Sequence, residues 1–202
     1  MSEKPNIIVF ISGSGSNLQA LIDAVKDGRI QANISLVVSN RRKAYGLVRA
    51  AEHGIPTTYH PLRPYTKAGK NRTDYEADLA DKIKPFAPDL IVLAGWMHIF
   101  GAEFLQQFPK RVINLHPALP GQFAGTHAIE RAYEAYQAGE ISHSGCMVHF
   151  AVPEVDAGAV IVQAEVSIHQ SDSLEGFVER MHETEHQIMV EAVQKVLARA
   201  TP

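Results

Sequence analysis

The amino-acid sequence predicts an α/β protein with a Rossmann-like, mostly parallel sheet and helices on both faces. Short apolar runs of strand length alternate with segments whose apolar residues recur at helical spacing, as in parallel strands joined by crossover helices. The runs are apolar throughout, which suits strands buried on both faces. Near the end of the chain, two strands without an intervening helix predict an antiparallel hairpin, and a long amphipathic segment predicts a C-terminal helix.

The first half of the chain follows this alternation closely. Apolar runs predict strands at Asn6–Ile11, Ile34–Val38 and Thr57–Tyr59. Helical spacing predicts helices at Ser16–Val25, Tyr45–His53 and Thr73–Ile83. Pro61–Lys70 contains two prolines and is predicted to be a loop.

The second half contains the clearest buried strand and the change of pattern. Further strands are predicted at Asp89–Gly95, Arg111–Leu115, Cys146–Val152 and Ala159–Ile168. The last two are joined by the turn Pro153–Gly158, and helices are predicted at Thr126–Ala138 and Ser173–Arg199.

Composition indicates one globular domain, residues 1–202, with 46% hydrophobic and 20% charged residues. The net charge of -3 gives no indication of a nucleic-acid surface. The single cysteine, Cys146, excludes an internal disulfide and a cysteine-rich zinc site. No stretch is long enough to span a bilayer, and the apolar run after Met1–Pro5 is too short for a secretory signal, so we expect a cytoplasmic protein with no membrane partner.

The stretch Asn114-Leu115-His116-Pro117 is the most informative part of the sequence. Proline ends a strand there, at the strand end where open α/β sheets carry their chemistry. Asn114 and His116 are two residues apart, so both lie on one side of the strand and can stabilise an oxyanion and move a proton. The alternative is a capping asparagine and a surface histidine.

A second candidate site is the loop Ser12–Leu18, which follows the first strand and opens the first helix. Its free N–H groups and the helix dipole favour an anion near Gly13, Ser14, Gly15, Ser16 and Asn17. Leu18 replaces the third glycine of the dinucleotide fingerprint, and no acid follows the second strand to hold a ribose. A monophosphate site, a dinucleotide site and a simple capped turn all remain open, with the first favoured.

The last helix contains a zincin-like sequence, His182-Glu183-Thr184-Glu185-His186. No suitable third ligand follows, so we expect no metal. Glu185 lies on the helix's apolar stripe, where a carboxylate needs a partner. That partner is either a structural cation or cap, or the amine of a ligand.

Asp156 lies in the turn of the predicted hairpin, where Asp and Gly are common for structural reasons alone. If the turn folds over the strand ends, Asp156 meets His116. A neighbouring carboxylate then raises the pKa of His116 and keeps it a proton donor near neutral pH.

These residues together resemble the phosphoribosylglycinamide formyltransferases. The resemblance covers nearly the whole chain and is carried by Ile11–Ala20, Leu93–Met97, Ile113–Pro117 and Val155–Ile161. Leu115–Gly121 and Thr126–Glu130 are similar to the fungal branch of that family.

The resemblance implies the formyltransferase fold and transfer of a formyl group from 10-formyltetrahydrofolate, a cosubstrate, to phosphoribosylglycinamide, with no permanently bound cofactor and no metal. It assigns catalysis to Asn114, a protonated His116 and Asp156. It assigns the phosphoribosylglycinamide to the Gly13–Asn17 loop and Glu185. The implied folate contacts are Arg72, Met97, His98, Ile99, Phe100 and Asn114.

Three departures from the family pattern stand out. Many relatives have Arg where this chain has His98, the segment Ala118–Gly125 is altered, and Ala157 replaces a glycine after Asp156. Arg63, Lys67, Lys70 and Arg72 form a basic stretch that suits an acidic folate tail or is a solvated loop. The sequence does not decide between a monomer and a weak dimer.

Rival functions share part of this pattern. A formyltetrahydrofolate hydrolase or a methionyl-tRNA formyltransferase uses the same Asn-His-Asp chemistry, although each usually carries an additional domain. A non-catalytic nucleotide-binding module of Rossmann type is the rival from another class.

Overall fold

The computed structural model describes residues 4–200 and contains one seven-stranded sheet in the order β3-β2-β1-β4-β5-β6-β7. The ends of the predicted 1–202 domain, residues 1–3 and 201–202, lie outside the described residues. Strands β1 to β5 are parallel, and β6 and β7 are antiparallel to their neighbours. The strands are β1 Asn6–Ile11, β2 Asn33–Ser39, β3 Thr57–Tyr59, β4 Leu90–Leu93, β5 Val112–His116, β6 His143–Phe150 and β7 Val160–Ser167.

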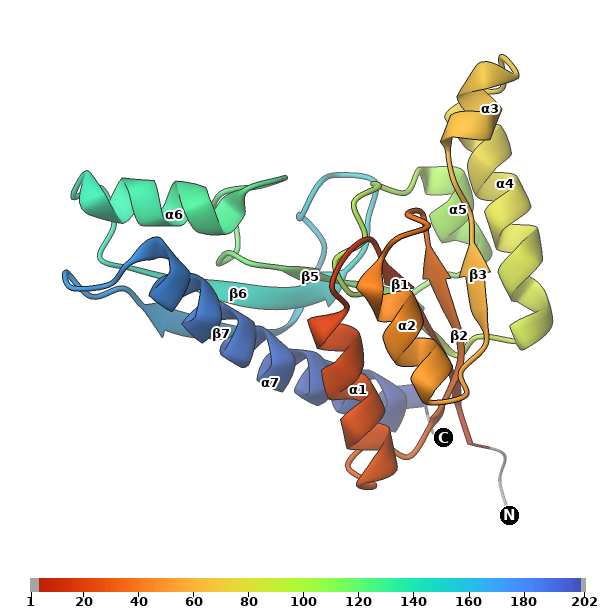
Figure 1. Cartoon of the computed structure of the whole chain (residues 1–202), viewed down its shortest axis with the longest axis horizontal. Helices are drawn as coiled ribbons and strands as arrows, with labels where there is room; N and C mark the ends of the chain where they lie inside the picture. Colours follow the sequence, from red (N-terminus) through yellow and green to blue (C-terminus); the bar gives the residue numbers. More distant parts are fainter. Residues whose placement is uncertain (1–3, 201–202) are drawn as a thin grey trace.

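Helices cover both faces of the sheet, as predicted (Figure 1). They are α1 Ser16–Lys26, α2 Tyr45–Glu52, α3 Arg63–Lys67, α4 Arg72–Ile83, α5 Ala102–Gln107, α6 Ala128–Gln137 and α7 Leu174–Ala200, with a 3-10 turn η1 at Lys84–Phe86. Helix α7 runs along the β6–β7 hairpin and ends beside α1 (Figure 1). No helix between residues 4 and 200 combines the length and apolar character needed to cross a bilayer.

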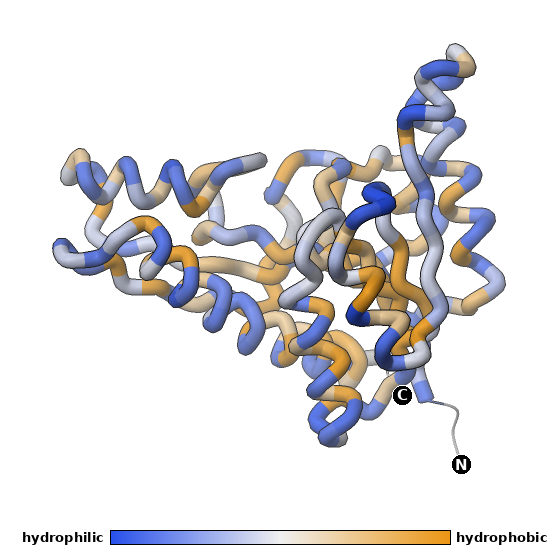
Figure 2. Tube along the Cα trace, in the orientation of Figure 1, coloured by the Kyte–Doolittle hydropathy of each residue, from blue (hydrophilic) through white to orange (hydrophobic). Residues whose placement is uncertain are grey.

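The sheet divides the core into two layers. In β1, Ile7, Val9 and Ile11 face the layer under α1 and α7, whereas Ile8 and Phe10 face the layer under α4 and α5. This is the period of two expected of a strand. Figure 2 shows the result, an apolar interior and hydrophilic outer faces on the helices.

Several bounds differ from the prediction by a residue or two, as in β4, which is predicted at Asp89–Gly95 and observed at Leu90–Leu93, and four differences have a clear physical basis or extent. The segment Pro61–Lys70 is not wholly a loop, because Arg63–Lys67 forms α3 with a proline in its first turn, where proline is tolerated. Helix α5 was not predicted, since its six residues bury Phe104 alone and show no period. Strand β6 begins at His143 rather than Cys146. Helix α6 begins at Ala128, because His127 adopts a left-handed φ of 57°.

Candidate active site

Three neighbouring strands, β1, β4 and β5, end at the same edge of the sheet. A cavity of about 430 Å³ opens there, where ligands bind in open α/β sheets. Every predicted site residue except Arg72 lines it: Gly13, Ser14, Gly15, Ser16, Asn17, Met97, His98, Ile99, Phe100, Asn114, His116, Asp156 and Glu185.

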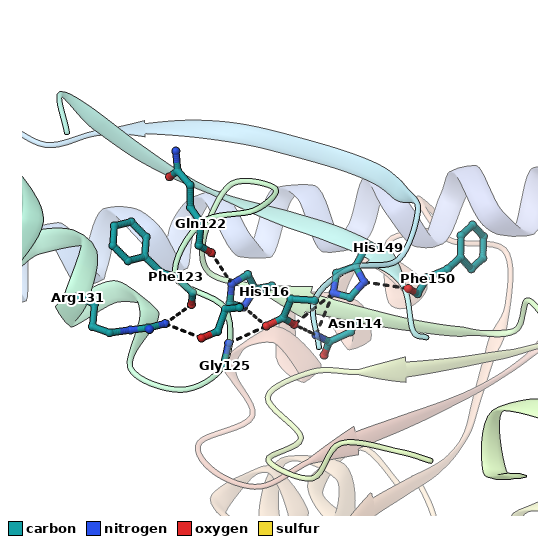
Figure 3. A network of polar contacts seen from close by, with 10 residues as sticks. Asn114, His116, Gln122, Phe123, Gly125, Arg131, His149 and Phe150 are labelled. Carbon is teal, nitrogen blue, oxygen red and sulfur yellow. Dashed lines mark hydrogen bonds and ion pairs between the residues drawn. The ribbon is translucent and has the colours of Figure 1, made fainter. Parts of the chain in front are cut away.

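The hairpin turn brings Asp156 over the end of β5, so the contact that the sequence left open is present. Asp156 Oδ2 lies 3.2 Å from His116 Nδ1 and accepts a 2.9 Å hydrogen bond from the Gly125 N–H (Figure 3). Asp156 has a φ of 53°, a conformation that Asp adopts more readily than most residues. Gly158 allows the turn to pack on β6, because a Cβ there would lie 1.7 Å from the Phe150 carbonyl oxygen.

His149 belongs to the same group and was not predicted from the sequence. It pairs with Asn114 across the β5–β6 ladder, and its ring is buried. Its Nδ1 faces the Phe150 carbonyl oxygen at 2.9 Å, and its Nε2 faces Asp156 and Asn114 (Figure 3). A histidine within an apolar strand does not by itself indicate a functional site. Only the register of β5 and β6 places His149 opposite Asn114.

The Asn114 amide keeps one N–H available for a ligand. Its Nδ2 lies 3.3 Å from both His149 Nε2 and Asp156 Oδ1, which are 3.5 Å apart. His149 Nε2 itself donates to Asp156, so the Asp156 carboxylate is the acceptor for one N–H of the Asn114 amide. A carboxamide nitrogen carries two N–H bonds, and among the described residues the second has no acceptor.

His116 is buried and has an acceptor at each ring nitrogen. Its Nδ1 faces Asp156, and its Nε2 lies 3.3 Å from the Gln122 carbonyl oxygen. Burial lowers the pKa of His116 below its ordinary 6.5, and the Asp156 carboxylate and Gln122 carbonyl offset only part of this. The Asp156 carboxylate raises the pKa of His116, as predicted, but desolvation outweighs this contribution and the net shift is downward.

Asp156 itself is ionised. Burial alone would raise its pKa, but hydrogen bonds from His149 and the Gly125 N–H, with the charges of His116 and His149, lower the pKa below 3.8. The site thus holds a carboxylate against the His116 imidazole, an arrangement that stabilises the imidazolium whenever the ring is protonated.

The glycine loop is built to receive an anion. The Gly13 carbonyl accepts from Gly46 N–H at 3.2 Å and the Ser14 carbonyl from Arg49 Nε at 3.0 Å. Among the described residues, the N–H groups of Ser14 to Asn17 have no acceptor. The loop therefore presents donors at the N-terminus of α1, where the helix dipole also favours negative charge.

Two glycines set the loop against α2. Gly15 has a φ of 71°, and a Cβ there would lie 2.6 Å from Gly46 Cα. A Cβ on Gly46 would in turn lie 2.4 Å from Ile11 Cδ1. This close approach fixes the position of the loop's donors.

Glu185 reaches the loop from α7. Its side chain is buried and accepts a 3.0 Å hydrogen bond from Asn17 Nδ2. Burial raises its pKa, and the bond from Asn17 and the charge of His182 oppose the rise. No structural cation pairs with Glu185 among residues 4–200, and no metal-binding group of three or more His, Cys, Asp or Glu residues is found there.

The far wall of the cavity is apolar. Met97 and Ile99 are 51% and 58% exposed, a large apolar surface that suits a planar ligand. His98 lies behind them with its Nε2 3.0 Å from Asn40 Nδ2, and burial, with Arg72 and Arg41, lowers its pKa to about 4.

Arg72 lies outside the cavity wall. Its Nε pairs with Glu76 at 2.7 Å, and its Nη2 donates to the Ile99 carbonyl at 2.7 Å. Arg72 is therefore connected to the apolar wall through its hydrogen bond to the Ile99 backbone carbonyl.

The altered segment Ala118–Gly125 forms a lid over His116. Arg131 donates to the Phe123 and Ala124 carbonyls, while the Gln122 carbonyl meets His116 (Figure 3). A ligand that uses His116 Nε2 must displace the Gln122 carbonyl.

An amide and an imidazole on β5 and a carboxylate from the β6–β7 turn lie beside a loop that favours anions, which is the arrangement of an enzyme for a small-molecule substrate. Residues 5–193 match the model of the formyl transferase family. The phosphoribosylglycinamide formyltransferase of Schizosaccharomyces pombe is 49% identical over 200 residues, covering 95% of this chain and 97% of the relative. That of Saccharomyces cerevisiae is 46% identical over 206 residues, covering 95% and 96%.

Solved structures agree. The phosphoribosylglycinamide formyltransferase of Bacillus halodurans superposes with a TM-score of 0.89 at 30% identity, covering 96% of each chain. That of Coxiella burnetii, solved with CHES, gives 0.85 at 41% identity, covering 95% of this chain and 86% of the other. The chain belongs to the formyl transferase family and, within it, to the phosphoribosylglycinamide formyltransferases.

Proposed function

We propose that the protein transfers the formyl group of 10-formyltetrahydrofolate to the amine of 5'-phosphoribosylglycinamide, in the cytoplasm, as a step of de novo purine biosynthesis. The observation that carries the proposal is the shape of one cavity. It joins an anion loop to an apolar wall, with Asn114, His116 and Asp156 between them. A phosphorylated substrate and a planar folate entering from these two ends would meet at that set.

The loop end takes the phosphoribosylglycinamide. The free N–H groups of Ser14 to Asn17 bind its phosphate, and Glu185 faces its amine. Because burial raises the pKa of Glu185, its carboxylate can accept a proton from a bound ammonium. Nucleophilic attack requires that neutral amine.

The apolar end takes the folate. Its pterin lies against the apolar wall formed by Met97, Ile99 and the buried Phe100. Arg72 supports this wall through its hydrogen bond to the Ile99 carbonyl. Binding both substrates in one cavity makes the reaction effectively unimolecular, which is a large part of catalysis.

The chemical step is attack of the neutral amine on the formyl carbon. The C=O electron pair moves onto oxygen, and the free N–H of Asn114 stabilises that oxyanion, a contribution of about 3–4 kcal/mol in comparable sites. Collapse of the tetrahedral intermediate re-forms the C=O bond and breaks the bond from the formyl carbon to the folate nitrogen.

His116 moves the proton between the two nitrogens. In its neutral form it accepts a proton from the attacking amine, and the resulting imidazolium is stabilised by Asp156 at 3.2 Å. It then returns the proton to the departing folate nitrogen, directly or through water. This cycle starts from neutral imidazole, in contrast to the protonated His116 implied by the resemblance.

Spectrophotometric release of tetrahydrofolate from 10-formyltetrahydrofolate, with and without phosphoribosylglycinamide, tests the proposal. We expect release that depends on phosphoribosylglycinamide. Equal release in its absence would indicate a hydrolase, and tight nucleotide binding without turnover would indicate a binding module.

A further inference from the structure

Helix α2 lies beside α1 and holds the glycine loop through two consecutive carbonyl groups (Figure 1). The Gly46 N–H donates to the Gly13 carbonyl at 3.2 Å, and Arg49 Nε donates to the Ser14 carbonyl at 3.0 Å. Every residue of the loop from Gly13 to Asn17 lines the cavity, whereas no residue of α2 does. The two carbonyls therefore face α2, and the cavity lies on another side of the loop.

These two contacts decide where the donors of the loop point. In a trans peptide the C=O and N–H bonds point in opposite directions, and the peptides of the loop are trans. The Gly13 carbonyl shares its peptide with the Ser14 N–H, and the Ser14 carbonyl shares its peptide with the Gly15 N–H. Holding both carbonyls against α2 therefore turns both N–H groups away from α2, toward the cavity.

Arg49 is itself held in place beside the loop. Its Nη1 donates to Gln19 Oε1 at 3.2 Å, and Gln19 Nε2 donates in turn to Asp23 Oδ1 at 2.9 Å. Its guanidinium lies over the Tyr45 ring, 5.0 Å from the centroid. A Cβ on Gly15 would lie 3.6 Å from Arg49 Cδ, so the side chain packs directly on the loop. The donor to the Ser14 carbonyl is therefore fixed by contacts at both ends of the side chain.

We propose that Arg49 is a positioning residue for the phosphate of the substrate. It orients the Ser14–Gly15 peptide so that the Gly15 N–H faces the phosphate, and it acts through this peptide without contacting the phosphate. The inference rests on the proposed function, which places the phosphate of phosphoribosylglycinamide at the loop. Because glycine tolerates either sign of φ, the Ser14–Gly15 peptide could turn over if Arg49 did not hold it.

Three substitutions separate the orienting hydrogen bond from the charge. Arg49→Met keeps most of the length of the side chain and removes every donor. Arg49→Gln places an amide N–H at the position of Nε but carries no charge. Arg49→Lys keeps the charge but has a methylene at the position of Nε.

The KM for phosphoribosylglycinamide is measured at saturating 10-formyltetrahydrofolate. A hydrogen bond that involves a charged group changes affinity by about tenfold or more, so Arg49→Met should raise this KM about tenfold. Arg49→Gln should recover to within about threefold of wild type, and Arg49→Lys should stay close to Arg49→Met. The KM for 10-formyltetrahydrofolate and kcat should stay within about twofold of wild type in all three.

Two controls distinguish positioning from a general structural defect. With ribosylglycinamide, which lacks the phosphate, kcat/KM should differ by less than about twofold between wild type and Arg49→Met. Arg42→Met removes the same charge from the segment that leads into α2, where Arg42 lies over the Tyr59 ring at 5.5 Å. This variant should retain the wild-type KM for phosphoribosylglycinamide.

An unchanged KM in Arg49→Met, an equal loss with ribosylglycinamide, or an equal loss in Arg42→Met would overturn the inference. Recovery in Arg49→Lys without recovery in Arg49→Gln would also overturn it, because the charge alone would then act. Calorimetric binding of ribose 5-phosphate tests the loop without turnover, and its Kd should rise about tenfold in Arg49→Met. If that binding weakens as expected but no formyl transfer occurs, the result counts against the proposed function and not against the role of Arg49.

Discussion

Replacing Asp156 with asparagine removes one charge from the centre of the site, keeps one acceptor oxygen and replaces the other with an NH2 group. Asparagine has nearly the same shape and adopts the φ of 53° found at this position. The change therefore separates the role of the carboxylate from its role in holding the turn. What it removes is the anionic acceptor 3.2 Å from His116 Nδ1.

The size of the effect follows from the charge that develops on His116. The Coulomb energy of an imidazolium and a carboxylate 3.2 Å apart is about 5 kcal/mol at an effective dielectric of about 20, which is an upper bound. A charge-assisted hydrogen bond contributes about 1.5–3 kcal/mol to stability. We take about 3 kcal/mol, which corresponds to about a 10²-fold loss in kcat.

The assay is steady-state release of tetrahydrofolate at saturating phosphoribosylglycinamide. We expect kcat to fall about 10²-fold while KM changes by less than about threefold, because Asp156 acts on the transition state. Asp81→Asn, an identical substitution at an exposed residue that pairs with Lys84, should leave both unchanged. A kcat for Asp156→Asn within about threefold of wild type would refute the role of the carboxylate.

Four further outcomes follow from the structure. Because burial lowers the pKa of His116, kcat should fall as pH decreases through a value below 6.5, whereas loss of kcat as pH rises through neutrality would require a protonated His116. Glu185→Gln should raise the KM for phosphoribosylglycinamide about tenfold. Because burial raises the pKa of Glu185 above 4.5, the contribution of this residue to the stability of the wild type is fully present below that pH and is lost as pH rises. The Tm of the variant relative to wild type should therefore be higher at pH 8 than at pH 4. An equal difference in Tm at both pH values would contradict this. Gly15→Ala, whose Cβ would lie 2.6 Å from Gly46 Cα, should raise the same KM by more than about tenfold, while Gly176→Ala in α7 should not.

Local sequence patterns were sufficient to predict the site residues at the strand ends. A period of two and a terminating proline place Asn114 and His116 on one side of β5, and the glycine loop is recognisable from its position between a strand and a helix. Glu185 was recognisable as a candidate because a carboxylate on the apolar stripe of a helix requires a polar partner. In the structure it lines the cavity and accepts a hydrogen bond from Asn17.

Other features depended on distant contacts. Asp156 reaches His116 because Gly158 lets the turn pack on β6, and His149 joins them through the β5–β6 register. The direction of the pKa shift of His116 depends on how deeply the lid and the hairpin bury the ring, which no spacing in the sequence reports. Helices α3 and α5 are too short to show a period.

The proposed transfer is tested most directly by following an isotopically labelled formyl group from 10-formyltetrahydrofolate by mass spectrometry. We predict that the label appears on the amine of phosphoribosylglycinamide in proportion to the tetrahydrofolate released. Label recovered as free formate, or tetrahydrofolate released without labelled phosphoribosylglycinamide, would contradict the proposed function.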